Sequence, residues 1–339
     1  MDNWLLYFAW DVMAQLTFSK PMGFMDTGDD FNGLLSTATQ ALDYFATVGQ
    51  LPTLDYWLAK NPIKPVGPPS FDFAAMFCAQ QSINRQKGAD AHESQHKDML
   101  DAFIDVKNSN PEQMDDNKVV GALLINVLAG ADTTAILLRA ITYYVLKNPQ
   151  VHRRLTQELS AINNTRPIGY ATASSLSYLD AVIKEASRMH PGIGLLLERV
   201  VPEAGLLLAD GTHIPPGTIV GMNPWVVHMD KATFGQDAEV FRPERWLRYE
   251  SEGETEEDYR KRLIEMKNAD LTFGAGRRVC LGSNISIVQA YMCTATLFSR
   301  FELALVYPEK DWHLQNSWFV RQSGIEVTIK KRGGTDSEF

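Results

Sequence analysis

The sequence reads Phe273-Gly274-Ala275-Gly276-Arg277-Arg278-Val279-Cys280-Leu281-Gly282, which places a lone cysteine after a loop rich in glycine and arginine. The apolar segment from Gly282 to Phe298 is predicted to be a helix. Free N–H groups and a partial positive charge at a helix N-terminus lower the pKa of a nearby thiol. Because the thiolate is the form that ligates metals, the stretch predicts a metal-ligating Cys280, and its glycines allow a flat ligand to approach the backbone.

Two other interpretations of this stretch stay open on the residues alone. A lone cysteine is often a buried, unreactive one. A dinucleotide-binding loop is the second alternative, since Gly274 and Gly276 open a helix and Glu302 follows at a suitable distance. Against it, Val279 stands where a third glycine belongs, and the preceding strand would be only Leu271-Thr272-Phe273.

The composition excludes several classes of protein. The chain has 339 residues, of which 45% are hydrophobic, so it is a folding sequence and not a disordered one. Its formal net charge of −9 disfavours a general nucleic-acid binder, and we expect no nucleic-acid partner. The sparse, odd set of cysteines (Cys78, Cys280 and Cys293) does not suggest a disulfide framework and favours a reducing compartment.

The hydrophobic pattern predicts a mainly α fold with a small β part. Helices are expected over residues 3–20, 31–50, 71–107, 115–146, 150–162 and 174–190. Short strands are expected from 195 to 222 and again from 303 to 330, and the charge-rich segment 250–262 is expected to be a solvated loop or helix. The apolar stretch 119–146 is interrupted by Asp132 and Arg139, so we expect a central buried helix instead of a membrane span.

Four motifs, in this order along the chain, together resemble the cytochrome P450 family. Ala129-Gly130-Ala131-Asp132-Thr133-Thr134 is similar to the oxygen-binding stretch of its central helix, and Glu185-Ala186-Ser187-Arg188 to its E-x-x-R motif. Pro243-Glu244-Arg245-Trp246 is similar to its P-E-R-[FW] segment. The haem-binding pattern F-x-x-G-x-R-x-C-x-G is matched at Phe273, Gly276, Arg278, Cys280 and Gly282.

The resemblance implies a cytochrome P450-like fold of a fungal type over a single domain, 1–339. A helical part would span 1–190, and 191–339 would hold the small sheet, the haem-binding loop and the following helix. We expect the chain to lack the N-terminal part of the family's fold, since neither Trp4 nor Trp10 is followed four residues later by the arginine of a W-x-x-x-R motif.

The resemblance also implies haem b, with its iron axially ligated by the Cys280 thiolate. The implied cofactor-binding residues are Phe273, Gly276, Arg278, Cys280, Gly282, Gly130 and Arg199. Arg199 stands where family members place an arginine for a haem propionate, because a guanidinium suits a carboxylate. The alternative is an ordinary surface arginine on a strand.

The remaining candidate residues have two interpretations each. By resemblance, Asp132 and Thr133 relay protons to dioxygen; alternatively, Thr133 bonds back to its own helix and Asp132 pairs with a basic side chain. On the residues alone, Glu185 and Arg188 lie opposite the apolar stripe of their helix and form an exposed ion pair. By resemblance, they form a structural triad with Arg245.

The implied activity is that of a haem-thiolate monooxygenase, which inserts one atom of dioxygen into a small lipophilic substrate, in fungal secondary metabolism. Electrons would come from an NADPH-dependent reductase. The alternatives are a catalytically inactive, truncated remnant and a haem-thiolate isomerase. The family expectation for localisation is the cytosolic face of the endoplasmic reticulum membrane, and the sequence itself predicts a soluble or peripheral chain. Candidate substrate-facing residues are 123–126, 193–196 and 317–319.

Overall fold

The computed structural model describes residues 1–90, 96–162 and 167–332. The chain divides into two compact units, one of residues 1–139 with 311–326 and one of residues 140–310 with 327–339. We call them unit 1 and unit 2. The boundary falls inside a helix and not near residue 190, so the single domain over 1–339 stays a prediction.

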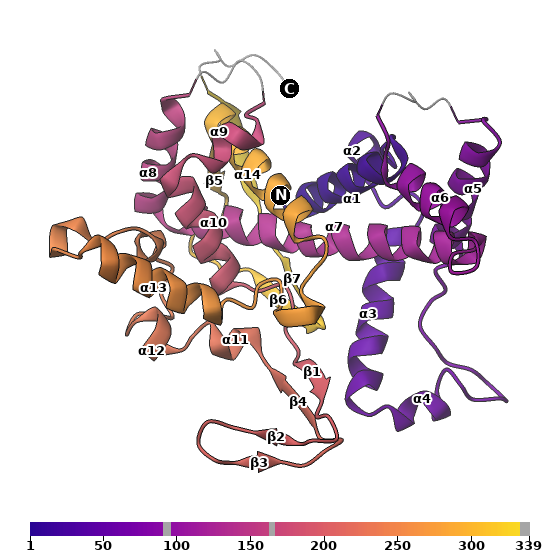
Figure 1. Cartoon of the computed structure of the whole chain (residues 1–339). Helices are drawn as coiled ribbons and strands as arrows, with labels where there is room; N and C mark the ends of the chain where they lie inside the picture. The colour runs from indigo at the N-terminus through magenta and orange to yellow at the C-terminus, as the bar shows by residue number, and fades with distance from the viewer. Residues whose placement is uncertain (91–95, 163–166, 333–339) are drawn as a thin grey trace. The chain divides into compact units, whose positions relative to one another are not determined.

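Unit 1 consists of helices and one hairpin (Figure 1). Its helices are α1 (Asp2–Phe18), α2 (Phe24–Thr27), α3 (Leu34–Gln50), α4 (Thr53–Trp57), α5 (Asp72–Gln86), α6 (Met99–Ser109) and the first part of α7 (Asp116–Lys147). Strands β6 (His313–Ser317) and β7 (Phe319–Ser323) pair in antiparallel fashion around Trp318. The helix expected over 71–107 is therefore two helices, and residues 91–95 of that prediction lie outside the described residues.

Helix α7 is buried unevenly along its length. Residues 134–143 are all buried, as the sequence predicts for a central helix. In the first half, burial recurs every fourth residue at Val119, Leu123 and Val127, whereas Ile125 is 68% exposed. Among the described helices, α7 is the one long and apolar enough to cross a membrane by length and composition. The continuous burial of its second half fits the predicted core helix.

Helix α1 packs against α7 through small and apolar residues. Trp10 and Met13 are buried on α1. A Cβ atom built on Gly130 of α7 would lie 2.7 Å from the Met13 Cε atom. The absence of a side chain at Gly130 thus leaves room for the end of the Met13 side chain against α7.

The core of unit 2 contains helix α10 (Ser177–Met189), whose residues 178, 179, 181–183 and 185–189 are buried. The other helices are the last part of α7, residues 140–147, and α8 (Pro149–Ser160), α9 (Tyr170–Ser174), α11 (Pro224–Val227), α12 (Lys231–Phe234), α13 (Glu256–Ala269) and α14 (Ser283–Arg300), with 3-10 turns η1 (Pro243–Trp246), η2 (Glu250–Glu252) and η3 (Gly276–Arg278). Segment 250–262 is thus a 3-10 turn followed by the start of a helix.

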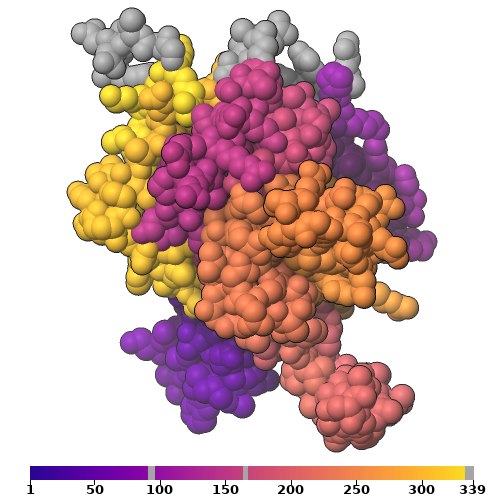
Figure 2. All heavy atoms as spheres, turned by 90° about the vertical axis from the view of Figure 1, so that its left-hand side faces the viewer, coloured from indigo at the N-terminus to yellow at the C-terminus, as the bar shows by residue number. Residues whose placement is uncertain are grey.

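The strands of unit 2 form three antiparallel pairs. They are β1 (Leu197–Val200) with β4 (Ile219–Met222), β2 (Leu206–Leu207) with β3 (His213–Ile214), and β5 (Phe301–Leu305) with β8 (Val327–Lys331). The β2–β3 hairpin projects from the rest of its unit in both views, and α13 lies on the face shown in Figure 2. The expected mainly α fold with a small β part is confirmed.

Candidate functional site

The cysteine loop of unit 2, residues 271–282, reverses direction on two glycines. Gly274 has a φ of +71° and Gly276 a φ of +66°, values that an L side chain adopts only with strain. The N–H of Gly274 donates to the carbonyl of Leu271 at 2.9 Å, and the N–H of Cys280 donates to the carbonyl of Phe273 at 2.8 Å. The second bond closes the loop, so that Cys280 lies beside its first residues and just before α14.

The thiol of Cys280 is exposed, and this separates it from the other two cysteines. Burial raises the pKa of both Cys78 and Cys293 to about 12, so those thiols stay protonated and inert. The interpretation of Cys280 as a buried, unreactive cysteine is therefore wrong. The dinucleotide-binding alternative is also wrong, because no strand precedes Gly274: residues 271–273 form a turn.

Residues 275–282 are exposed without interruption, and two large apolar side chains are among them. The Val279 side chain is 46% exposed and that of Leu281 is 98% exposed, on either side of Cys280. No described residue accepts a hydrogen bond from the N–H of Leu281 or Gly282. An exposed thiol between bare apolar side chains and free amides fits a flat apolar ligand that carries its own metal.

On helix α10, Glu185 and Arg188 form a buried ion pair. Neither side chain is more than 1% exposed. The guanidinium of Arg188 donates to both carboxylate oxygens of Glu185, from Nε at 2.9 Å and from Nη2 at 2.8 Å. The prediction from the residues alone, an exposed pair, is wrong, because η1 and the turn around His228 cover the polar side of α10. A buried pair of this kind is strongly destabilised when one partner is removed, by about 3–5 kcal/mol.

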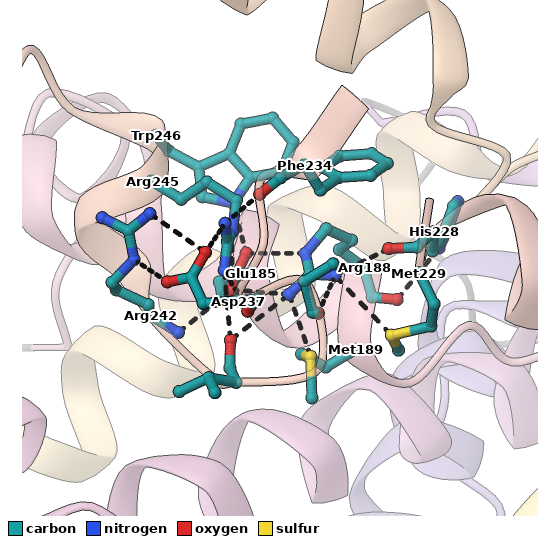
Figure 3. Close-up of polar contacts among 12 residues, drawn as sticks. Glu185, Arg188, Met189, His228, Met229, Phe234, Asp237, Arg242, Arg245 and Trp246 are labelled. Carbon is teal, nitrogen blue, oxygen red and sulfur yellow. Dashed lines mark hydrogen bonds and ion pairs between the residues drawn. The ribbon is translucent and has the colours of Figure 1, made fainter. Parts of the chain in front are cut away.

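Arg245 joins this pair, as the resemblance implies. Its Nε donates to the Oε1 of Glu185 at 3.3 Å, and the indole N–H of Trp246 donates to Oε2 at 2.8 Å. Asp237 accepts from Arg245 Nη1 at 2.7 Å and so balances the second cation. Figure 3 shows these side chains converging from α10, η1 and the segment between α12 and η1.

Arg199 lies on β1 and is exposed. Its Nη1 donates to the carbonyl of its neighbour Glu198 at 2.6 Å, and no described carboxylate pairs with it. This environment leaves the guanidinium available to a ligand carboxylate and equally suits a surface arginine. Arg278, in η3, is likewise exposed.

Asp132 and Thr133 lie in unit 1, on α7. The Oδ1 of Asp132 accepts from the indole N–H of Trp10 at 2.8 Å. Burial raises the pKa of Asp132, while the Trp10 hydrogen bond and the charges of Arg139 and Arg321 act in the opposite direction. The protonated carboxyl is thus favoured more than in water, as a proton donor requires.

The hydroxyl of Thr133 bonds back to its own helix, donating to the carbonyl of Ala129 at 2.8 Å. This is the local bond that the alternative interpretation expects. Ala129 is exposed and Thr133 is partly exposed, so the side of α7 that carries the Thr133 hydroxyl is accessible. The roles of Gly130, Asp132 and Thr133 toward dioxygen stay predictions.

The sequence did not indicate the contacts of three buried side chains that hold these residues. Trp10 reads as one of many apolar residues of α1, and Trp246 as part of a motif, yet each donates its indole N–H to a candidate carboxylate. His228 has no motif of its own. The available signal was weak: a tryptophan that is fully buried needs an acceptor for its N–H.

Comparison with known proteins identifies the class to which this arrangement belongs. The profile of the cytochrome P450 family matches residues 1–328. The chain therefore belongs to the cytochrome P450 family, whose members bind haem through a cysteine thiolate.

Its relatives are fungal enzymes. The chain is 42% identical over 334 residues to the cytochrome P450 monooxygenase cfoH of Aspergillus candidus, covering 98% of this chain and 62% of the relative. It is 39% identical over 337 residues to the cytochrome P450 monooxygenase cicH of Emericella nidulans, covering 98% and 65%. The chain thus spans a little under two thirds of the length of these relatives.

The cysteine loop fits this cofactor. The described residues contain no group of three or more histidine, cysteine and acidic side chains that could hold a bare metal ion. A lone exposed thiolate suits a metal whose other ligands come with the cofactor, and haem iron is such a metal.

Proposed function

We propose that the protein is a haem-thiolate monooxygenase, an oxidoreductase that incorporates one atom of molecular oxygen into a small lipophilic substrate in fungal secondary metabolism. The observation that carries the proposal is the exposed thiol of Cys280 in a loop closed by the Cys280–Phe273 hydrogen bond. The monooxygenase names of the relatives support the reaction class.

The cysteine loop would hold the cofactor through several groups. Cys280 would supply the thiolate, Gly276 and Gly282 would let the ring approach, and Phe273 would pack beneath it. Arg199 and Arg278 would pair with the propionates, since both guanidiniums are exposed. When bound, haem supplies the chemistry of dioxygen activation, which a thiolate ligand favours by donating electron density.

Asp132 and Thr133 would move protons in unit 1. The raised pKa of Asp132 lets its carboxyl hold a proton, and Trp10 fixes the oxygen that does not carry it. Thr133 would pass a proton on after its hydroxyl leaves the Ala129 carbonyl. An acid of this kind typically contributes about 10²–10⁴-fold to a rate.

A lipophilic substrate is supported by exposed apolar side chains at the positions that the sequence singles out. Ile125 on α7 is 68% exposed and Leu196, before β1, is 45% exposed. Trp318, at the tip of the β6–β7 hairpin, is 39% exposed. Apolar and aromatic side chains of this kind would suit a lipophilic ligand.

For the partners, we propose an NADPH-dependent reductase as the electron donor and dioxygen as the co-substrate. We also propose the cytosolic face of the endoplasmic reticulum membrane as the site of action, from the resemblance to eukaryotic family members. Consumption of NADPH and dioxygen with substrate distinguishes a monooxygenase from an isomerase, which needs neither in net amount. The buried, protonatable Asp132 favours the monooxygenase.

The test is the spectrum of the reduced protein under carbon monoxide. Wild-type protein is expected to show the strongly red-shifted Soret band of thiolate-ligated haem, and Cys280→Ala is expected to lose it. Cys78→Ala, which removes a buried thiol, is the matched control and should keep the band. Failure of haem to bind the wild-type chain would overturn the proposal and favour the inactive remnant.

A further inference from the structure

His228 lies in the turn after α11, outside every motif, and is fully buried. Both nitrogens of its ring are bonded to the backbone of distant segments. The Nδ1 atom lies 2.9 Å from the carbonyl oxygen of Arg188, on α10. The Nε2 atom lies 2.8 Å from the backbone nitrogen of Leu271, the first residue of the cysteine loop. The imidazole therefore bridges α10 and that loop.

The two contacts fix the tautomer of the ring. A backbone N–H can only donate, so Nε2 accepts from Leu271. The ring proton is then on Nδ1, which donates to the Arg188 carbonyl. The imidazole is neutral, and its burial, which lowers the pKa of His228, keeps it so. The carboxylate of Asp270, 3.5 Å from Nε2, and the hydrogen bond to the Arg188 carbonyl oppose this shift of the pKa, and the charge of the Arg188 guanidinium adds to it.

The α10 side of this bridge is rigid. The guanidinium of Arg188 donates from Nη1 to the carbonyl of His228 at 2.7 Å, so the two residues bond to each other in both directions. Glu185 holds the same guanidinium from the other side (Figure 3). The ring of Phe234 packs edge-on against the imidazole, with centroids 6.3 Å apart. His228 is thus held by hydrogen bonds through its ring and its carbonyl and by a ring contact.

The start of the cysteine loop is tied to α10 through His228, and more weakly through the Thr272 hydroxyl, which donates to the carbonyl of Ser187 at 3.5 Å. Residues 275–282 are exposed, so packing within unit 2 does not fix them. They are held at the far end by α14 and at the near end by Leu271 and its neighbours. Two backbone hydrogen bonds connect Leu271 to Cys280. The carbonyl of Leu271 accepts from the N–H of Gly274, and the carbonyl of Phe273 accepts from the N–H of Cys280. A displaced Leu271 would displace the acceptor of the Cys280 N–H.

We propose that His228 is a positioning residue for the haem ligand. Its neutral imidazole links the Glu185–Arg188–Arg245 network to Leu271 and so fixes the position of the Cys280 thiolate. The proposal rests on haem ligation by Cys280, but its first test uses protein without haem, so that the two can fail separately.

The experiment compares two amides that each preserve one half of the bridge. In His228→Gln, the longer side chain can place its carbonyl oxygen near the Nε2 position and accept from Leu271. In His228→Asn, the shorter side chain can place its amide N–H near the Nδ1 position and donate to Arg188, but it leaves the Leu271 N–H without an acceptor. Hydrogen exchange of the backbone amides is measured on the full chain without haem.

We expect His228→Asn to speed exchange at Leu271 and Cys280 about tenfold or more, since a buried donor loses its acceptor. His228→Gln should stay within about threefold of wild type at both amides. Exchange in the β5–β8 pair, which does not contact the bridge, should be unchanged in both variants. Equal effects of the two substitutions, or faster exchange throughout unit 2, would overturn the proposal in favour of simple packing.

Two further measurements have a readout that packing alone would not move. In haem-loaded protein under carbon monoxide, His228→Asn should lose at least half of the red-shifted thiolate band, and His228→Gln should retain most of it. Retention of the full band by His228→Asn would contradict the proposal. Nitrogen NMR of the wild-type histidine rings covers the case in which His228→Asn does not fold: a proton on Nε2 of His228 instead of Nδ1 would exclude the bridge.

Discussion

The buried carboxylates of Glu185 and Asp132 differ in the number of hydrogen bonds that they accept. Glu185 accepts hydrogen bonds from two arginine side chains, one indole and a backbone N–H, so its charge is fully satisfied. Asp132 is held through Oδ1 by Trp10, and the arginines that influence it act through their charge. A buried carboxylate with few donors is costly to ionise. This difference fits a structural role for Glu185 and a proton-handling role for Asp132.

Asp132→Asn should therefore stabilise unit 1 while it slows turnover. Because burial raises the folded-state pKa of Asp132, the folded protein binds this proton more tightly than the unfolded chain does. Wild-type stability then falls as pH rises from the ordinary aspartate pKa through the raised one. Asparagine does not titrate and still accepts from Trp10, so the variant should be more stable at pH about 8 by roughly 1 kcal/mol. The advantage should vanish in acid.

Denaturant unfolding at several pH values measures this difference, and turnover with reductase should fall about 100-fold. Asp105→Asn removes an exposed carboxylate of the same unit and serves as the control, with both quantities near wild type. If Asp132→Asn lost stability at high pH, the carboxylate would be a stabilising partner of the arginines and not a proton store.

At the scale of elements, the packing of α1 on α7 depends on Gly130. An alanine there would bring its Cβ to 2.7 Å from Cε and 2.9 Å from Sδ of Met13, which is itself buried. Glycine costs a helix interior about 1 kcal/mol relative to alanine. Overpacking a dense interior costs about 1–3 kcal/mol. The steric cost should exceed the propensity gain.

We predict that Gly130→Ala destabilises the protein by about 1 kcal/mol in the wild-type background. In a Met13→Ala background the same substitution should be neutral or stabilising by up to about 1 kcal/mol, because the clashing atoms are gone. A double-mutant cycle of unfolding free energies measures the coupling. Gly121→Ala on the same helix, where an added Cβ meets nothing within 4 Å, is the control and should stabilise slightly. Additive effects of Gly130→Ala and Met13→Ala would show that the helices adjust freely.

The elements with strong periodicity could be predicted from the sequence, and their surroundings could not. Helices α1, α3, α7, α8, α10 and α14 lie within a few residues of their predicted bounds. The burial of Glu185 and Arg188 could not be predicted, because the segments that cover them come from η1 and the His228 turn, far along the chain. The cysteine loop was predicted from local spacing, whereas its anchor, His228, belongs to no local pattern. Hydrophobic periodicity predicts which face of a helix or strand is buried, but not which distant segments cover its polar side chains.

At the scale of the whole molecule, the cysteine loop carries charge of the opposite sign to the net charge of the chain. The chain carries a formal charge of −9. Arg277 and Arg278 are nevertheless exposed in the cysteine loop and form no ion pair with any described residue. A small basic surface on an acidic protein can still orient an acidic partner, since charges attract locally and are screened beyond about 10 Å at 0.1 M salt. The loop that presents the haem ligand is thus also suited to receive an electron donor.

Arg277→Glu should therefore weaken reduction by an acidic reductase without altering the haem spectrum, because Arg277 lies outside the residues assigned to the cofactor. We expect the second-order rate of reduction to fall about tenfold at low salt, with little difference from wild type near 0.5 M salt, where the attraction is screened. Stopped-flow reduction under carbon monoxide gives this rate directly. Lys64→Glu makes the same change of charge in the exposed 61–70 loop of unit 1 and should leave the rate within about twofold. Equal losses in the two variants would mean that net charge alone attracts the partner, and the cysteine loop would then not be its docking surface.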